Sequence, residues 1–236
     1  MTKSNQNYYN NVWSGLKLHH PSRYNTWPTL SPLAEVLPSR LEIGPGLRPR
    51  LPIFGTHFVD LSQVVVNRLN KAGGVALLGD INSLPFPDQQ FDMICAFEVL
   101  EHVADDNKAV SELSRVLKDD SVLFFSVPLD NVSWSEFDII VGHFRRYNHQ
   151  QVLSLITSNY LILEQSAAFG MMPVSQRTIN FGMWCLKCIR KPTLRLYELL
   201  IYPAALLFQQ KLNLVPGLTS NTNAESMLFV CKRDCR

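Results

Sequence analysis

Short apolar runs alternate with amphipathic stretches between residue 41 and about residue 165. The runs predict strands at Arg40–Ile43, His57–Asp60, Val75–Gly79, Phe91–Phe97, Val122–Val127 and Leu161–Ser166. Apolar residues at helical spacing predict helices at Ser62–Ala72, Asp105–Leu117 and His149–Thr157. Strands that alternate with helices predict a mostly parallel sheet with helices on both faces, a doubly wound α/β fold.

A seventh strand is predicted at Ala224–Lys232, after a long interruption from Gly170 to Asn223. The interruption contains the apolar stretch "LRLYELLIYPAALLF", which is shorter than the roughly 20 residues that cross a bilayer. We expect a helical insertion that packs over the mouth of a ligand site or against a second subunit. The sharper alternative is a helix that lies in a membrane surface, so residues 181–215 are expected to make peripheral membrane contact or a homodimer.

Composition narrows the class of protein. The chain has 236 residues, 46% of them hydrophobic and 18% charged, which is typical of a globular protein. A formal net charge of +2 is small for this length and argues against a nucleic acid as partner. The first residues, "MTKSNQNYYNNVW", lack the apolar core of a signal peptide, and five cysteines, an odd number, fit a reducing compartment. A cytoplasmic location is expected.

Two glycines follow the first predicted strand in "LEIGPGLRPRLP". Gly44 and Gly46 allow a ligand to approach the backbone closely, and Glu42 stands just before them. A dinucleotide would need a third glycine and a helix N-terminus for its pyrophosphate, but Pro49 occupies that position. Only eleven residues separate Gly46 from Phe58 of the next strand, which leaves hardly any room for a helix. S-adenosylmethionine has no phosphate and carries cationic groups that suit an acid, so it is the favoured cofactor.

Two further acids follow the next two strands. Asp60 in "FVDLS" ends the second strand, where a carboxylate can accept both ribose hydroxyls. Asp80 follows the third strand and can accept from the adenine amino group. Each acid alone also fits a solvated strand end or a helix cap. Three acids in succession, each at the carboxyl end of a strand, favour a donor-binding site.

Together, "LEIGPG", "FVDLS", "GDINSLPFPDQQFDMICAFEVLEHV" and "SVLFFSVP" resemble the class I S-adenosylmethionine-dependent methyltransferases. The closest resemblance is to the branch with "LPFPD" and "EVLEHV", which is similar to ubiquinone-pathway O-methyltransferases. It implies a Rossmann-like core of residues 39–169 and 224–236 with an antiparallel last strand. Residues 1–38 would be an N-terminal cap segment, and 170–223 a helical insertion over the acceptor site.

The resemblance also implies individual contacts with the donor. Leu61 would meet the ribose, Ile81 the adenine and Phe97 the methionine. The full expected donor site is Glu42, Gly44, Gly46, Asp60, Leu61, Asp80, Ile81 and Phe97. The chain departs from the family in its short segment after Gly46, with Arg48 where a third glycine is common.

A second group of residues follows the fourth and fifth strands. "FEVLEHV" places Glu98, Glu101 and His102 together, and "VGHFRRYN" places His143 on the same sheet edge. Two carboxylates and two imidazoles can bind a divalent cation, and the set resembles the metal site of small-RNA 2′-O-methyltransferases. Many methyltransferases similar to this branch carry "EVLEHV" without metal, so no cation is favoured. His143 and His102 are then the expected catalytic residues, with His143 the first candidate for general base and loop positioning its alternative role.

These observations predict methyl transfer from S-adenosylmethionine to a small hydrophobic acceptor, most readily at an oxygen. The alternative is a regulatory or scaffold subunit that binds the donor or its product without turnover. Arg145 and Arg146 form either a solvated pair or a holder for an anionic substrate.

Overall fold

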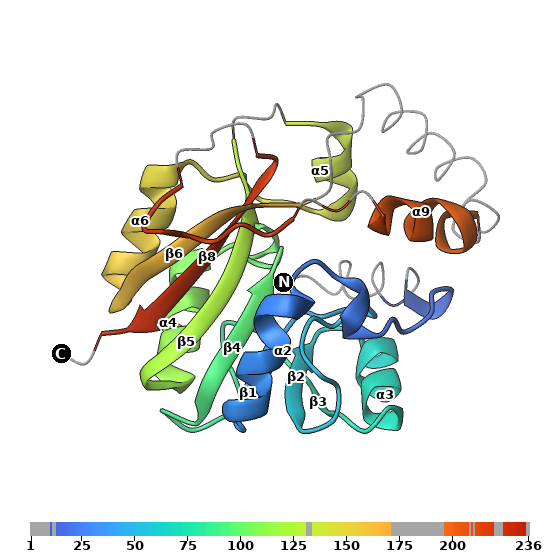
Figure 1. Ribbon diagram of the computed structural model, residues 1–236, viewed down its shortest axis with the longest axis horizontal. Coiled ribbons are helices and arrows are strands. Elements are labelled where there is room, and N and C mark those ends of the chain that lie inside the picture. The colour runs from blue at the N-terminus through green and yellow to red at the C-terminus, as the bar shows by residue number, and fades with distance from the viewer. Residues whose placement is uncertain are drawn as a thin grey trace.

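The computed structural model describes residues 10, 13–130, 134–170, 196–207, 209, 211–219 and 224–234. Its eight-stranded sheet has the order β3-β2-β1-β4-β5-β8-β6-β7 (Figure 1). The strands are β1 (Arg40–Ile43), β2 (Thr56–Asp60), β3 (Val75–Leu78), β4 (Phe91–Phe97), β5 (Leu117–Pro128), β6 (Leu161–Phe169), β7 (Val215–Pro216) and β8 (Ser226–Arg233).

The α-helices are α2 (Trp27–Val36), α3 (Gln63–Lys71), α4 (Asp106–Val116), α5 (Glu136–Val141), α6 (His149–Ser158) and α9 (Tyr202–Leu206). A 3₁₀ turn, η1 (Pro21–Arg23), precedes α2, and a second, η2 (Leu100–His102), follows β4. A π-helical turn, η3 (Tyr197–Ile201), leads directly into α9. Within the described ranges, no helix combines the length and the apolar character needed to cross a membrane.

The sheet confirms the predicted doubly wound α/β fold. Strands β1 to β5 pair in parallel, and β8 runs antiparallel to both β5 and β6. The expected antiparallel last strand is therefore present, inserted between β5 and β6. An eighth strand, β7, was not predicted; it pairs with β6 through only two residues and lies inside the predicted insertion.

One boundary differs clearly from the sequence prediction. Helix α4 ends at Val116, and Leu117 already has extended backbone angles and begins β5. The polar residues that follow include Asp120, whose positive φ of 57° interrupts the regular strand before its apolar part. Helical spacing continues through Leu117, which explains why the pattern assigned that residue to the helix.

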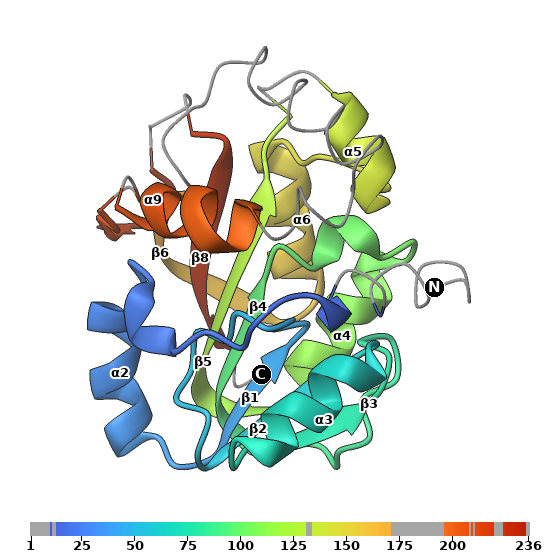
Figure 2. The same cartoon turned by 90° about the vertical axis from the view of Figure 1, so that its right-hand side faces the viewer.

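Helices cover both faces of the sheet (Figure 2). Helices α4 and α6 pack on one face in a cluster that includes Leu113 and Ile156. On the opposite face, α2 packs through Leu30 and α3 through Leu69, in two separate clusters. Because strands of the sheet interior are buried on both faces, they read as nearly continuous apolar runs in the sequence.

The parallel strands all end at one edge of the sheet, and α5 and α9 lie at this end of the molecule (Figures 1 and 2). The N-terminal segment and the predicted insertion meet here, although they are far apart in the sequence. The side chain of Gln209 accepts from the N–H of Asn25 and donates to the carbonyl of Arg23. The hydroxyl of Tyr202 donates to that of Tyr24 over 3.1 Å. This edge of the sheet is where the candidate site lies.

Candidate active site

A cavity of about 280 Å³ opens at the carboxyl ends of β1, β2 and β4 and beside the turn after β3. All eight residues expected to hold the donor line it, together with Trp13, Arg48, Arg50, Glu98, Val99 and His102. The topology explains this convergence, because parallel strands on either side of β1 deliver their terminal residues to one crevice.

Glu42 is buried at the end of β1 and holds the loop that follows. Its carboxylate accepts hydrogen bonds of 2.9 and 3.0 Å from the N–H of Arg50 and one of 3.0 Å from the N–H of Leu51. Burial raises the pKa of Glu42 to about 7, although these hydrogen bonds and the nearby Arg50 guanidinium oppose the shift. Glu42 was expected to bind the ammonium group of the donor's methionine. In the structure its carboxylate already has a structural role, because it holds the loop.

Both glycines of the motif adopt the left-handed backbone conformation. Gly44 has φ +59° and Gly46 φ +54°. A Cβ atom on Gly46 would lie 2.5 Å from a ring carbon of Trp13, and one on Gly44 would lie 2.9 Å from Val99. The indole of Trp13 thus rests directly on the glycine turn, and the N-terminal segment contributes to the cavity wall.

Asp60 and Asp80 lie at the carboxyl ends of their strands, as expected. Asp60 accepts from the N–H of Gly46 over 3.1 Å and from the N–H of Ser62 over 2.8 Å, so it joins β2 to the glycine turn. Burial raises its pKa to about 6, against the effect of those bonds. Asp80 accepts from the backbone and the side chain of Asn82. Both residues line the cavity, and an ionised carboxylate has about four acceptor positions.

Glu98 follows β4 with a positive φ of 52°, a conformation that is unusual for a residue with a side chain. Its carboxylate accepts from the hydroxyls of Ser126 over 2.7 Å and Ser226 over 3.0 Å. Burial raises the pKa of Glu98. These contacts turn the side chain toward β5 and β8, so Glu98 does not join the other members of the candidate metal set.

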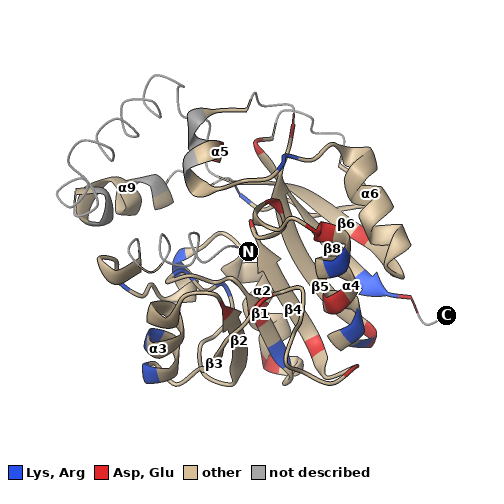
Figure 3. Cartoon of the chain, turned by 180° about the vertical axis from the view of Figure 1, so that it is seen from behind, with Lys and Arg blue, Asp and Glu red and all other residues tan. Residues whose placement is uncertain are grey.

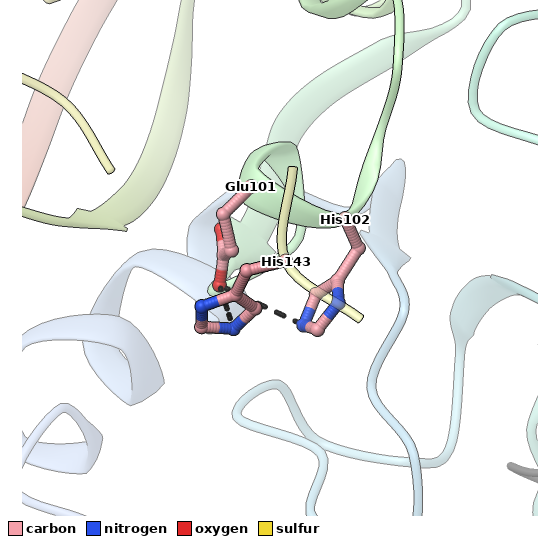
Figure 4. A group of neighbouring side chains, drawn as sticks. All are labelled: Glu101, His102 and His143. Atoms are coloured by element: carbon pink, nitrogen blue, oxygen red, sulfur yellow. Dashed lines mark ion pairs between the residues drawn. The ribbon is translucent and has the colours of Figure 1, made fainter. Parts of the chain in front are cut away.

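The remaining three members do gather (Figure 4). Nε2 of His102 lies 3.8 Å and Nε2 of His143 lies 3.9 Å from Oε1 of Glu101, and possible ligand atoms of all three lie within 4.8 Å of one another. Glu101 is fully buried, and its carboxyl oxygens have no hydrogen-bond partner among the described residues. Burial and the charge of Glu98 raise the pKa of Glu101 well above its usual range. Among the described residues, Glu101, His102 and His143 could together hold a divalent cation, which would require the ionised form of the Glu101 carboxyl.

The two histidines differ in their access to the cavity. His102 lines it, whereas His143 stands behind His102 with ring centroids 4.6 Å apart and is not among the lining residues. Burial and the neighbouring His143 lower the pKa of His102 to about 4, so its ring is neutral near pH 7. Burial also lowers the pKa of His143, although the carboxylate of Asp138 opposes this.

Asp138 is a residue of this cluster that the sequence reading missed. It accepts from Nδ1 of His143 over 2.8 Å, from two nitrogens of Arg146 and from Ser135. Burial alone would raise the pKa of Asp138, but the Arg146 and Ser135 hydrogen bonds lower it to about 2. The spacing Asp138 to His143 across a short helix is not a recognised motif, so only the capping box at Ser135 gave a sequence signal.

Neither arginine suggested as a substrate holder faces the cavity. Arg146 is buried and paired with Asp138. Arg145 lies 2.6 Å from a carboxylate oxygen of Asp106. The alternative of a simple solvated pair is also wrong, because both side chains have structural partners.

Sequence comparison matches part of the chain to a known protein family. Residues 43–125 match the family described as "Methyltransferase domain". An uncharacterized protein of Methanocaldococcus jannaschii is 30% identical over 113 residues, which are 45% of this chain and 43% of that protein. The chain therefore aligns with less than half of the length of this curated relative.

Solved structures share the fold at low sequence identity. A Thermotoga maritima S-adenosylmethionine-dependent methyltransferase, described as a possible histamine N-methyltransferase, has a TM-score of 0.56 at 14% identity, covering 82% of this chain and 81% of that one. A Haemonchus contortus phosphoethanolamine N-methyltransferase bound to S-adenosylhomocysteine has a TM-score of 0.53 at 15% identity, covering 83% and 49%. The [4+2]-cyclase SpnF has a TM-score of 0.54 at 18% identity, covering 86% and 79%.

The fold is thus that of class I S-adenosylmethionine-dependent methyltransferases, and the domain family implies S-adenosylmethionine as cofactor. The cavity residues fit such a group: an open glycine turn and two acids at successive strand ends, with no helix N-terminus behind the turn that would select a pyrophosphate. The likeness to a cyclase shows that this fold does not by itself fix the reaction.

We expect Gly46→Ala to weaken binding of S-adenosylhomocysteine, because its Cβ would displace the Trp13 ring, which lines the cavity. Gly217→Ala is the matched control, since Gly217 has φ +65° and open space around it. Both variants should lose about 1 kcal/mol of unfolding free energy through backbone strain, and Gly46→Ala should lose more because its Cβ also clashes with the Trp13 ring. Calorimetric titration should show lower affinity only for Gly46→Ala, and equal affinities would contradict this account.

We expect Glu42→Gln to change how stability depends on pH. The pKa of Glu42 rises from 4.5 to about 7 on folding, so its favourable contribution is complete below pH 4.5 and is lost as pH rises through 7. On going from pH 5 to pH 8, wild type should lose about 3 kcal/mol of unfolding free energy relative to Glu42→Gln. Urea unfolding of both proteins at the two pH values measures this difference. Glu164→Gln, at a side chain that is 43% exposed, is the control for a carboxyl outside the cavity.

Proposed function

We propose that this protein transfers the methyl group of S-adenosylmethionine to an oxygen of a small, largely hydrophobic acceptor. The observation that carries the proposal is the convergence of the glycine turn, Asp60, Asp80 and His102 on one cavity. In this reaction the acceptor oxygen attacks the methyl carbon as the sulfur leaves, forming the O–C bond while the S–C bond breaks. Because the sulfonium is already activated, the protein contributes mainly alignment and removal of the hydroxyl proton.

His102 is the favoured proton acceptor in this proposal, with His143 and Asp138 behind it. Its position on the cavity wall and its neutral state near pH 7 support the role. The bond from His143 Nδ1 to Asp138 fixes the tautomer and orientation of His143, which packs edge-on against the His102 ring. General-base catalysis requires such a held imidazole within reach of the hydroxyl.

The surface at the mouth of the site supports an apolar acceptor. Leu199, Leu200 and Leu207 are 66, 63 and 83% exposed, and α9 carries no charged residue (Figure 3). Ile139 of α5 and Phe144 after it are also largely exposed, at the same end of the sheet. Exposed apolar groups of this kind favour a hydrophobic acceptor, a second subunit or a membrane surface. Residues 181–195 of the proposed contact region lie outside the described residues.

The proposal is tested first at the donor. Wild-type protein should bind S-adenosylmethionine in calorimetric titration, and Asp60→Asn should bind it at least about tenfold more weakly because an ionised acceptor becomes a neutral amide. Asp88→Asn, at a side chain that is 74% exposed, is the control. A wild-type protein that does not bind the donor would overturn the proposed function. Unchanged affinity in Asp60→Asn would remove that residue from the site.

Transfer itself is tested with methyl-labelled donor and fractionated small-molecule extracts. His102→Ala should lower labelling of the acceptor by about 10²-fold or more while donor affinity stays within about threefold, and His20→Ala should change neither. Since the pKa of His102 is about 4, the rate at saturating donor should stay constant from pH 8 to pH 5 and fall as the ring protonates below that range, whereas donor affinity should already weaken as Asp60, with a pKa of about 6, becomes protonated. Donor binding without labelling of any fraction would favour the non-catalytic alternative.

A further inference from the structure

The buried side chain of Tyr202 anchors the α9 segment, residues 196–207, which contains η3 and α9. Tyr202 begins α9 and is 1% exposed, and no other side chain that the structure describes in this segment is buried. The turn that leads into it, η3, is π-helical, a form that occurs in short pieces and often at functional sites. The attachment of the α9 segment to the rest of the protein therefore depends largely on the surroundings of Tyr202.

Tyr202 contacts the loop after β1, which forms one wall of the donor cavity. The Cζ atom of Arg48, a lining residue, lies 3.7 Å from the ring centroid of Tyr202. The His19 ring packs edge-on against Tyr202 with centroids 5.0 Å apart, and the N–H of His19 donates to the carbonyl of Leu47 over 2.9 Å. Tyr202 itself is not among the lining residues. It therefore contacts the wall without reaching the cavity.

Tyr24 of the N-terminal segment makes a corresponding contact with the same loop. It is 3% exposed, and the Cζ atom of Arg50, another lining residue, lies 3.8 Å from its ring centroid. The hydroxyls of Tyr24 and Tyr202 are joined by the hydrogen bond of 3.1 Å. Gln209 adds two hydrogen bonds between the chain after α9 and the N-terminal segment. The two tyrosines thus connect the α9 segment, the N-terminal segment and the cavity wall.

Displacement of the α9 segment would change this wall. Arg48 would lose the aromatic face that attracts its guanidinium, and the bond between the two tyrosines would break. The loop that carries both arginines would then be less well held at the cavity. A ligand that packs against the ordered wall binds the docked arrangement more tightly than the displaced one. By linkage, the same ligand favours docking by the same factor.

We propose that Tyr24 and Tyr202 are positioning residues that couple donor binding to docking of the α9 segment, an inference that rests on the proposed function. The donor in the cavity favours the docked segment. The exposed side chains of Leu199, Leu200 and Leu207 are then held at the mouth of the site, where the acceptor is proposed to bind. Acceptor affinity is therefore higher once the donor is bound, and the predicted insertion contributes to donor affinity although Tyr202 does not line the cavity.

The first test measures donor affinity in the full chain, with S-adenosylhomocysteine as the probe. Calorimetric titration should show binding about tenfold weaker in Tyr202→Leu, which corresponds to about 1.4 kcal/mol, because this variant loses the Arg48 stack and the hydroxyl bond. Tyr202→Phe keeps the ring, should lie between wild type and Tyr202→Leu, and is the second variant if Tyr202→Leu does not fold. Equal affinities of wild type and Tyr202→Leu would overturn the proposal.

The control is Tyr147→Phe. The hydroxyl of Tyr147, which is 1% exposed, donates to Asp106 over 3.0 Å, and its ring packs in the cluster on the face that α4 and α6 cover. This variant therefore also loses a buried hydroxyl bond, but away from the loop after β1. Its affinity for S-adenosylhomocysteine should stay within about twofold of wild type.

Hydrogen exchange tests the coupling in the reverse direction. Saturating S-adenosylhomocysteine should slow exchange of the backbone amides of residues 199–207 about tenfold in wild type and in Tyr147→Phe, although these residues do not line the cavity. In Tyr202→Leu the ligand should slow the same amides less than about twofold, with Tyr202→Phe between the two. A merely structural role of Tyr202 would leave the effect of the ligand unchanged.

Two exchange results would overturn the proposal: no protection of residues 199–207 in wild type, or equal protection in wild type and Tyr202→Leu. A wild-type protein that does not bind S-adenosylhomocysteine at all would refute the proposed function instead.

Discussion

The site depends on one buried carboxylate, that of Glu42. In a doubly wound fold the first strand is usually followed by a helix whose N-terminal N–H groups face the ligand. Here no helix follows β1, so the loop needs another acceptor for its buried N–H groups. Glu42 supplies it by accepting from Arg50 and Leu51, and this fixes the loop path from Gly44 onward. The glycine turn, the Trp13 contact and the direction of the Arg50 side chain all follow from that path.

Burial of a carboxylate at this position costs desolvation free energy, and the nearby Asp60 is destabilised in the same way. The pKa values of Glu42 and Asp60 are both raised, to about 7 and about 6, because burial opposes their charged forms. Each nevertheless accepts backbone N–H bonds that favour ionisation. The cavity therefore contains two carboxyl groups whose pKa values lie close to neutral pH. Its net charge depends on the bound ligand, because a cationic donor favours the ionised carboxylates.

Sequence patterns located the fold because the central strands are buried on both faces and therefore appear as apolar runs. Arg40–Ile43 and Phe91–Phe97 agree with the structure at both ends. The two-residue β7 could not be predicted, since a strand this short has no periodicity and forms only because β6 offers a free edge. Donor-site residues at strand ends were predictable for a related reason: topology alone brings those ends together.

Side-chain partners were less predictable than positions. Glu42 was identified as a site residue, but its backbone partners lie eight and nine residues later in an irregular loop that no periodic pattern describes. Asp138 was missed because it acts through tertiary contacts with His143 and Arg146. The same contacts show why Arg146 is not a substrate holder: its charge is already matched by a buried carboxylate.

The shortened loop also determines how three distant parts of the chain meet. Arg48 stacks on Tyr202 of the predicted insertion, and Arg50 stacks on Tyr24 of the N-terminal segment. Because the two tyrosine hydroxyls are bonded, a shift of either segment would disturb both arginines. A helix in place of this loop would not bring two guanidinium groups to the same wall. With no helix after β1, the loop places the Arg50 guanidinium on the side of β1 toward β4 and β6, 5.9 Å from the rings of Phe97 and Phe169.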